Sequence, residues 1–110
     1  MAKFECVFPS GYSFNDILQY FHTHLTKNHG ECTGSSDYSS ERARVAVRVY
    51  ERYSWSGGNR VSMSMTLAGR GDELFLSAIT SGGSQAMFFK VNTWGEEAFL
   101  DTLLDVLQHL

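Results

Sequence analysis

Apolar and polar residues alternate with a period of two in four segments of the chain, which predicts four β-strands. These segments are Lys3 to Phe8, Ala43 to Arg52, Arg60 to Leu67 and Glu73 to Thr80. In the last of them apolar residues fall on both sides, which is typical of a strand that is at least partly covered on both faces. A further apolar run, Ala86 to Val91, predicts another strand near the C-terminus.

The segment from Ala43 to Arg52 shows the clearest alternation in the chain. Small and β-branched residues occupy one side, and cationic residues with one tyrosine occupy the other. We therefore expect a strand with one dry face and one cationic face. The dry positions are Ala43, Val45, Val47 and Val49, and the cationic side holds Arg42, Arg44, Arg48, Tyr50 and Arg52.

Two further segments have the 3.6-residue spacing of amphipathic helices. The first is predicted from Phe14 to Lys27, and Asn28-His29-Gly30 supplies residue types that accept the left-handed conformation at a helix end. Near the C-terminus, Thr93 and Glu96 form a capping box in front of a broad apolar stripe. This pattern predicts a second helix that runs to Leu110.

The order of these elements predicts a two-layer α+β domain. Glu31 to Ser40 is polar and has no strong period, so it is either a weak strand or a long loop. With it the order is β-α-β-β-β-β-β-α, and a curved antiparallel sheet with both helices on one face buries the apolar stripes of both helices. This topology resembles half of the TATA-binding-protein fold, a resemblance of element order that carries no function.

Length and charge narrow the class of protein. With 110 residues, 43% of them hydrophobic, the chain fits a single domain over residues 1–110. The net charge of -3 argues against whole-molecule attraction to nucleic acid or to an anionic membrane. No leader-like run or membrane span is recognised, and Cys6 and Cys32 lack metal-ligand spacing. We expect a cytoplasmic protein with two free thiols.

Three blocks of sequence are similar to a family of small bacterial proteins of unknown function. They are Val47 to Thr66, Phe75 to Phe89 and Gly95 to Asp101. The similarity covers nearly the whole chain, and members of that family are free-standing proteins of about this size. The resemblance implies no activity, cofactor or catalytic residue.

The predicted architecture leaves one face of the sheet without helices. Tyr50, Phe75 and Ile79 would then place apolar area on that bare face, and such patches commonly mark a partner or ligand surface. Symmetric dimers are common among small proteins. We therefore favour a non-enzymatic association module that binds itself or a protein partner through the sheet face or a strand edge.

An alternative function follows from the arginines. Arg44, Arg48 and Arg52 are four residues apart and share one strand face, with Tyr50 beside them and Trp55 at the end of the row. Guanidinium groups and rings together suit phosphate or single-stranded nucleic acid. The competing interpretation is a solvated face, or one paired with acidic groups of a second subunit. The negative net charge and the shortness of the row weigh against nucleic acid.

The remaining chemistry is weaker. His22 and His24 point to different sides of one helix and cannot together hold a metal. No nucleophile, general base or carboxylate pair stands out by spacing, so we predict no catalytic residue, cofactor or metal. A small-ligand cleft between sheet and helices, in a carrier or an enzyme, is a second alternative, although its residues are more often plain core. That cleft would be lined by Met63, Met65, Phe88 and Trp94.

Overall fold

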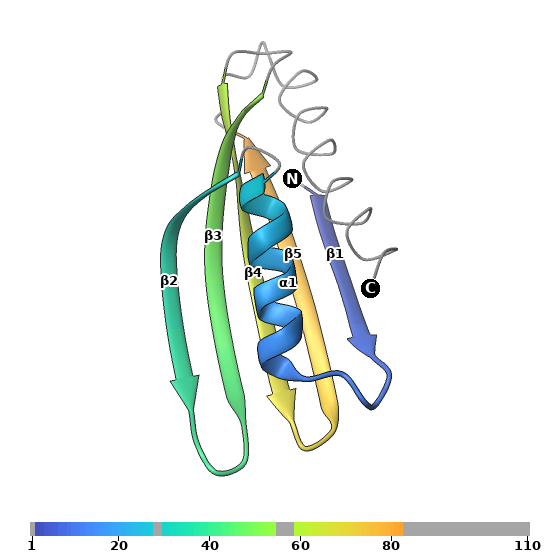
Figure 1. Ribbon diagram of the computed structural model, residues 1–110. Coiled ribbons are helices and arrows are strands. Elements are labelled where there is room, and N and C mark those ends of the chain that lie inside the picture. The colour runs from blue at the N-terminus through green and yellow to red at the C-terminus, as the bar shows by residue number, and fades with distance from the viewer. Residues whose placement is uncertain (1, 28–29, 55–58, 83–110) are drawn as a thin grey trace.

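The computed structural model of the chain describes residues 2–27, 30–54 and 59–82. This part is a compact α+β unit with a five-stranded antiparallel sheet and one helix (Figure 1), which confirms the predicted class. The predicted strand at 86–91 and the predicted helix at 93–110 lie outside the described residues. The elements are β1 (Ala2–Phe8), α1 (Phe14–Lys27), β2 (Glu31–Ser39), β3 (Arg44–Ser54), β4 (Asn59–Arg70) and β5 (Glu73–Gly82).

The strand order in the sheet is β1-β5-β4-β3-β2. Strands β2 to β5 follow one another as a meander, whereas β1 crosses back to pair with β5, Ala2 opposite Thr80. The polar segment that the sequence left undecided between strand and loop is strand β2. It pairs with β3 along its length, with a register shift between Cys32 and Gly34.

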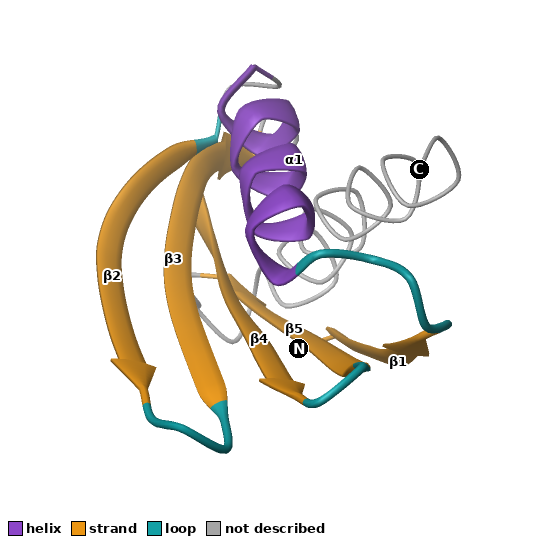
Figure 2. Ribbon diagram, turned by 60° about the horizontal axis from the view of Figure 1, so that its bottom comes forward, coloured by secondary structure: helices purple, strands orange, loops and turns teal. Residues whose placement is uncertain are grey.

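Helix α1 lies across one face of the sheet, which curves around it (Figure 2). We call this side the helix face. The apolar stripe of α1 is buried through Ile17, Phe21 and Leu25, none of which is more than 1% exposed. Burial of such side chains contributes about 1.5–3 kcal/mol each. The sheet residues that complete the core are Phe8, Tyr50, Val61, Met63, Met65, Leu67, Leu74, Leu76 and Ala78.

Both ends of α1 are hydrogen-bonded. At its start the backbone N–H of Asp16 donates to Ser13 Oγ at 3.5 Å. At its end the N–H of Gly30 donates to the carbonyl of Leu25 at 2.9 Å, and a Cβ on Gly30 would lie 2.6 Å from that same oxygen. Glycine is therefore required at position 30 for space, and not for the left-handed backbone that the sequence suggested.

The face of strand β3 that we expected to be cationic is the one that faces α1. Arg48 and Tyr50 lie opposite the buried residues Met65 and Met63 of β4, and Tyr50 itself is fully buried. The predicted dry face was therefore wrong. A tyrosine ring brings more apolar area than a valine, and arginine stems pack on apolar neighbours while their charged ends reach polar partners. The displaced aliphatic residues, Val45, Val47 and Val49, lie half-buried on the opposite side.

Candidate interaction surface

The side of the sheet away from α1 carries an apolar row that crosses all five strands. Five residues lie side by side in register, one from each strand. The two ends of the row are the most exposed, Tyr38 at 66% and Val7 at 60%. In strand order from β2 to β1 the row is Tyr38, Val45, Ala68, Phe75 and Val7.

Two further rows complete this side, which we call the outer face. The next row is polar in four strands and holds Thr66 in its centre. The third row combines Val49 of β3 with Ile79 of β5, whose side chain is 39% exposed. The outer face is thus a mixture of aliphatic, aromatic and hydroxyl side chains over the middle of the sheet.

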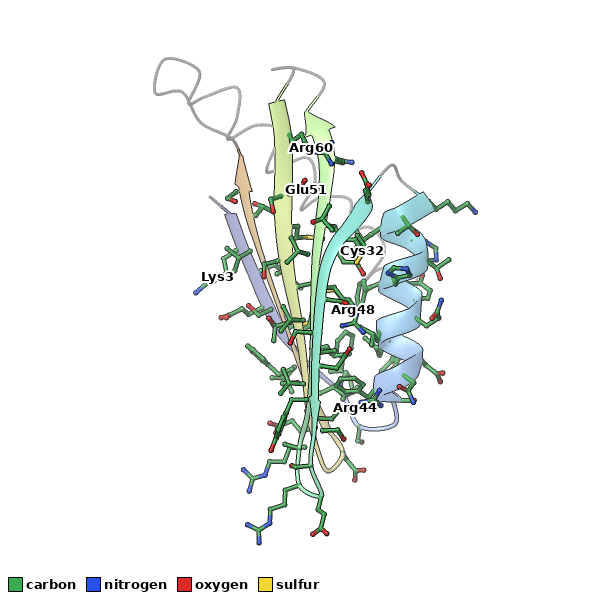
Figure 3. All side chains as sticks on the ribbon, turned by 90° about the vertical axis from the view of Figure 1, so that its left-hand side faces the viewer. Lys3, Cys32, Arg44, Arg48, Glu51 and Arg60 are labelled. Carbon is green, nitrogen blue, oxygen red and sulfur yellow. The ribbon has the colours of Figure 1, made fainter. Side chains whose placement is uncertain are left out.

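Charged residues of the outer face lie at its margins and neutralise one another. On β1, Lys3 Nζ lies 3.8 Å from Glu5 Oε1, and Lys3 points away from the helix side (Figure 3). At the far end Arg60 contacts Glu51 at 3.0 Å and Glu31 at 3.4 Å. Neither group presents an uncompensated block of one sign.

The arginines of β3 lie on the helix face (Figure 3). Arg48 is 16% exposed, and its Nη1 lies 3.1 Å from Asp37 Oδ1 of β2. The same guanidinium donates to the carbonyl of Val47 at 3.0 Å. Arg44 lies over the Phe14 ring, with Cζ 4.3 Å from the ring centroid. Burial lowers the pKa of the Arg52 guanidinium.

Beside the arginines, the Tyr50 hydroxyl and His22 Nδ1 share a hydrogen bond of 3.0 Å that joins β3 to α1. Burial, with a smaller contribution from the nearby Cys32, raises the pKa of Tyr50 to about 12, and Arg48 acts weakly in the opposite direction. The Cys32 thiol donates to the carbonyl of Gly34 at 3.5 Å. The Tyr50 hydroxyl, the His22 ring and the Cys32 thiol thus each have a hydrogen-bond partner within the protein.

A groove of about 400 Å³ lies on the helix face at the start of α1. Its floor is formed by Arg44, Gly69 and Leu74, which are neighbours in register on β3, β4 and β5. Residues 12–14 line one side and residues 39–43 the other. A Cβ on Gly69 would lie 2.9 Å from the ring of Phe14, so this position needs glycine for the helix to approach.

A scan against protein families matches residues 1–110 to a family described as a family of unknown function, DUF6054. The chain belongs to the DUF6054 family. Comparison with curated proteins and with solved structures found no match. The family description names no activity, ligand or partner.

In this DUF6054 chain the predicted site residues divide between two faces. Arg44, Arg48, Tyr50 and Arg52 share the helix face of β3, whereas Phe75 and Ile79 lie on the outer face. Tyr50 therefore adds nothing to the exposed apolar patch, which corrects the expected surface. Trp55 lies outside the described residues. The sequence analysis did not include Tyr38 and Val7 in the apolar surface. A tyrosine within a Ser-rich segment and the position of Val7 on the opposite side of its strand from Phe4 and Cys6 could have indicated them.

Within the described part of the DUF6054 chain, the side chains form no group of three or more His, Cys, Asp or Glu that could hold a metal ion. Cys6 and Cys32 are free thiols, and burial raises the pKa of Cys6. No helix among the described residues is long and apolar enough to cross a membrane. Two candidate binding surfaces therefore remain among the described residues, the outer face with its apolar row and the groove at the start of α1.

Proposed function

We propose that this protein is a non-enzymatic association module that forms a symmetric dimer by packing its outer face against the outer face of a second copy. The observation that carries the proposal is the apolar row across all five strands, with Tyr38 and Val7 exposed at its ends. An exposed apolar patch of this kind on a small protein commonly marks an association surface.

The size of the outer face supports a second copy as the occupant. The sheet is five strands wide, and its strands hold seven to twelve residues. At ordinary strand spacing and rise such a face measures roughly 24 Å by 23–40 Å, or about 550–950 Å². A standard protein interface buries about 800 Å² per partner. One face packed on its copy therefore suffices for a stable dimer.

The charge distribution supports the same occupant. A two-fold interface brings identical groups near one another, so a self-associating face must avoid a block of one sign. The ion pairs Lys3–Glu5 and Arg60–Glu51 lie at the margins, and the row that holds Thr66 carries a charge only at its β1 end, in Glu5. A neutral centre also offers a polyanion nothing to bind.

The alternative of nucleic-acid binding along the β3 arginines has less support from the structure. These arginines lie on the side that α1 covers, and Arg48 is paired with Asp37. The small-ligand cleft has less support too, because Met63 and Met65 are fully buried in the core.

We further propose that the whole chain has the fold of half of the TATA-binding protein, with a second helix at the C-terminal end. The described order and sheet topology support a likeness to half of the TATA-binding-protein fold, and the capping box at Thr93 supports a second helix. Two free thiols and the family resemblance support a bacterial, cytoplasmic protein.

The test is the mass of the full chain in solution by light scattering after size exclusion. We expect twice 12.4 kDa. Thr66→Glu places a charge in the centre of the outer face and should weaken the dimer at least ~100-fold, since an unpaired charge in an interface costs several kcal/mol. A matched pair on β2 controls for charge: Ser36→Glu lies on the outer face and Ser35→Glu on the helix face, and both positions are exposed.

Ser36→Glu should weaken the dimer and Ser35→Glu should leave it intact. A monomeric wild type at high concentration would refute the proposal. A dimer that Thr66→Glu leaves unchanged would refute the assigned surface, and circular dichroism of each variant establishes that it is folded.

A further inference from the structure

Arg44 differs from Arg48 and Arg60 in having no acidic partner among the described residues. Arg48 has Asp37, and Arg60 has Glu51 and Glu31. Among the described residues no carboxylate pairs with Arg44, although its side chain is partly buried. Partial burial of a charge without a counter-ion is unfavourable, so an anion bound beside this guanidinium would be stabilised.

The guanidinium of Arg44 is also held in place. Its Cζ lies over the Phe14 ring, 4.3 Å from the ring centroid, which holds the end of the side chain beside α1. A contact with a ring face supplies no carboxylate or phosphate oxygen, which a guanidinium binds through two parallel hydrogen bonds from its N–H donors. Phe14 in turn reaches β3 only because Gly69 has no side chain to block it.

The space beside Arg44 is large enough for a ligand. The groove holds about 400 Å³, within the range of roughly 300–1,000 Å³ that is usual for small-molecule sites. Its far wall is a hydrogen-bonded turn: Ser40 Oγ accepts from the N–H of Ala43 at 3.2 Å and of Arg42 at 3.3 Å, and the Ser40 N–H donates to the Ala43 carbonyl at 2.8 Å.

We propose that this groove binds a small organic anion, whose carboxylate or phosphate is held by Arg44 and whose apolar part lies against Phe14 and Leu74. The lining also holds Arg42 and Glu41, which balance one another, so the charge that decides the sign of the ligand is Arg44. The site lies on the helix face and is independent of the proposed dimer, which uses the outer face.

The experiment is an NMR titration of the full chain with three probes that each carry a phenyl ring: benzoate, phenyl phosphate and neutral benzamide. We expect saturable shifts of the Arg44 side-chain and Phe14 signals with one or both anions and none with benzamide. The tighter of the two anions identifies the preferred group. Arg44→Gln should weaken binding about tenfold, the value of one charge-assisted hydrogen-bonded contact.

The matched control is Arg70→Gln. Arg70 is adjacent to Gly69 in sequence but lies on the outer face, so this variant removes the same charge without touching the groove. It should bind the anion like the wild type. Arg44→Lys keeps the charge without the planar fork and should bind with intermediate affinity, which covers the case in which Arg44→Gln does not fold.

Three results would overturn the site. They are no saturable shift with either anion at millimolar concentration, equal binding of benzamide, and an Arg70→Gln loss as large as that of Arg44→Gln. The last would mean diffuse attraction by net charge rather than a built pocket.

Discussion

His22 of α1 and Tyr50 of β3 are joined by a hydrogen bond of 3.0 Å between Nδ1 and the phenolic hydroxyl, across 28 residues of sequence. Their rings also meet, with centroids 5.8 Å apart. Tyr50 is fully buried, and this contact satisfies the polar end of an otherwise apolar side chain. This pair therefore adds a polar contact to the apolar packing that holds the helix on the sheet.

Removal of that hydroxyl should destabilise the fold modestly. Tyr50→Phe keeps the ring and loses the hydrogen bond to His22, so we expect a loss of about 1 kcal/mol in the free energy of unfolding. Urea denaturation of Tyr50→Phe, His22→Ala and the double variant measures the coupling. Additive effects of the two changes would show that the pair contributes nothing beyond its separate contacts.

Stability should fall in alkali because of the same tyrosine. Burial raises the pKa of Tyr50 from 10 to about 12, so the unfolded chain loses this proton before the folded chain does. The contribution of the protonated Tyr50 hydroxyl to the free energy of unfolding is therefore fully present below pH ~10. It is lost as the pH rises towards ~12. The urea midpoint should drop more steeply over this range in the wild type than in Tyr50→Phe. Parallel curves would contradict the raised pKa.

A methyl group at Gly69 should disturb the contact of α1 with the sheet. The added Cβ would lie 2.9 Å from Phe14 Cδ2 and 3.0 Å from Leu74 Cδ2, so Gly69→Ala should cost about 1–3 kcal/mol. Gly34→Ala on β2 is the control, because its Cβ would meet Val49 at an ordinary 3.7 Å. Thermal denaturation should separate the two variants, and equal melting temperatures would contradict the steric account.

The ion pair of Arg48 should matter more than the pair on β1. Arg48 is largely buried, so Asp37→Asn leaves a shielded charge with a weaker partner and should cost about 1 kcal/mol. Lys3 and Glu5 are exposed, and Glu5→Gln should cost less than about 0.5 kcal/mol. Chemical denaturation at low and high salt tests the ranking, which a larger loss for Glu5→Gln would reverse.

The proposed dimer makes the melting temperature depend on protein concentration. If folding and association are linked, mass action raises the melting temperature as the chain is concentrated. Thr66→Glu should abolish this dependence, and Ser35→Glu should preserve it. A wild-type melting temperature that stays constant from micromolar to millimolar protein would contradict a reversible dimer.

The sequence predicted α1 and the strands β1, β3, β4 and β5 well, because each has a strong period and a turn at its ends. It left β2 undecided, since a strand rich in serine has no apolar side to show its period. Pairing with the strongly patterned β3 supplies what β2 lacks on its own.

The faces of β3 were assigned the wrong way round for a related reason. Alternation shows that a strand has two unlike sides, but it does not show which side meets the helix. Valines occupy one side, and the other mixes arginines with Ala46 and Tyr50, both of which are fully buried. The salt bridge of Arg48 with Asp37 and the stacking of Arg44 on Phe14 depend on residues from other elements, which a single-strand pattern cannot show.

The strand that leaves the ribosome first is among the last to find its partner. Glu5 of β1 accepts a hydrogen bond from Ser77 of β5, 72 residues further along, whereas β2 to β5 can pair in succession through short hairpins. Closure of such a long loop is entropically costly and slow compared with hairpin formation. Until β5 has been made, the backbone edge of β1 that pairs with it stays unpaired, although Phe8 of β1 can already contact Phe21 of α1.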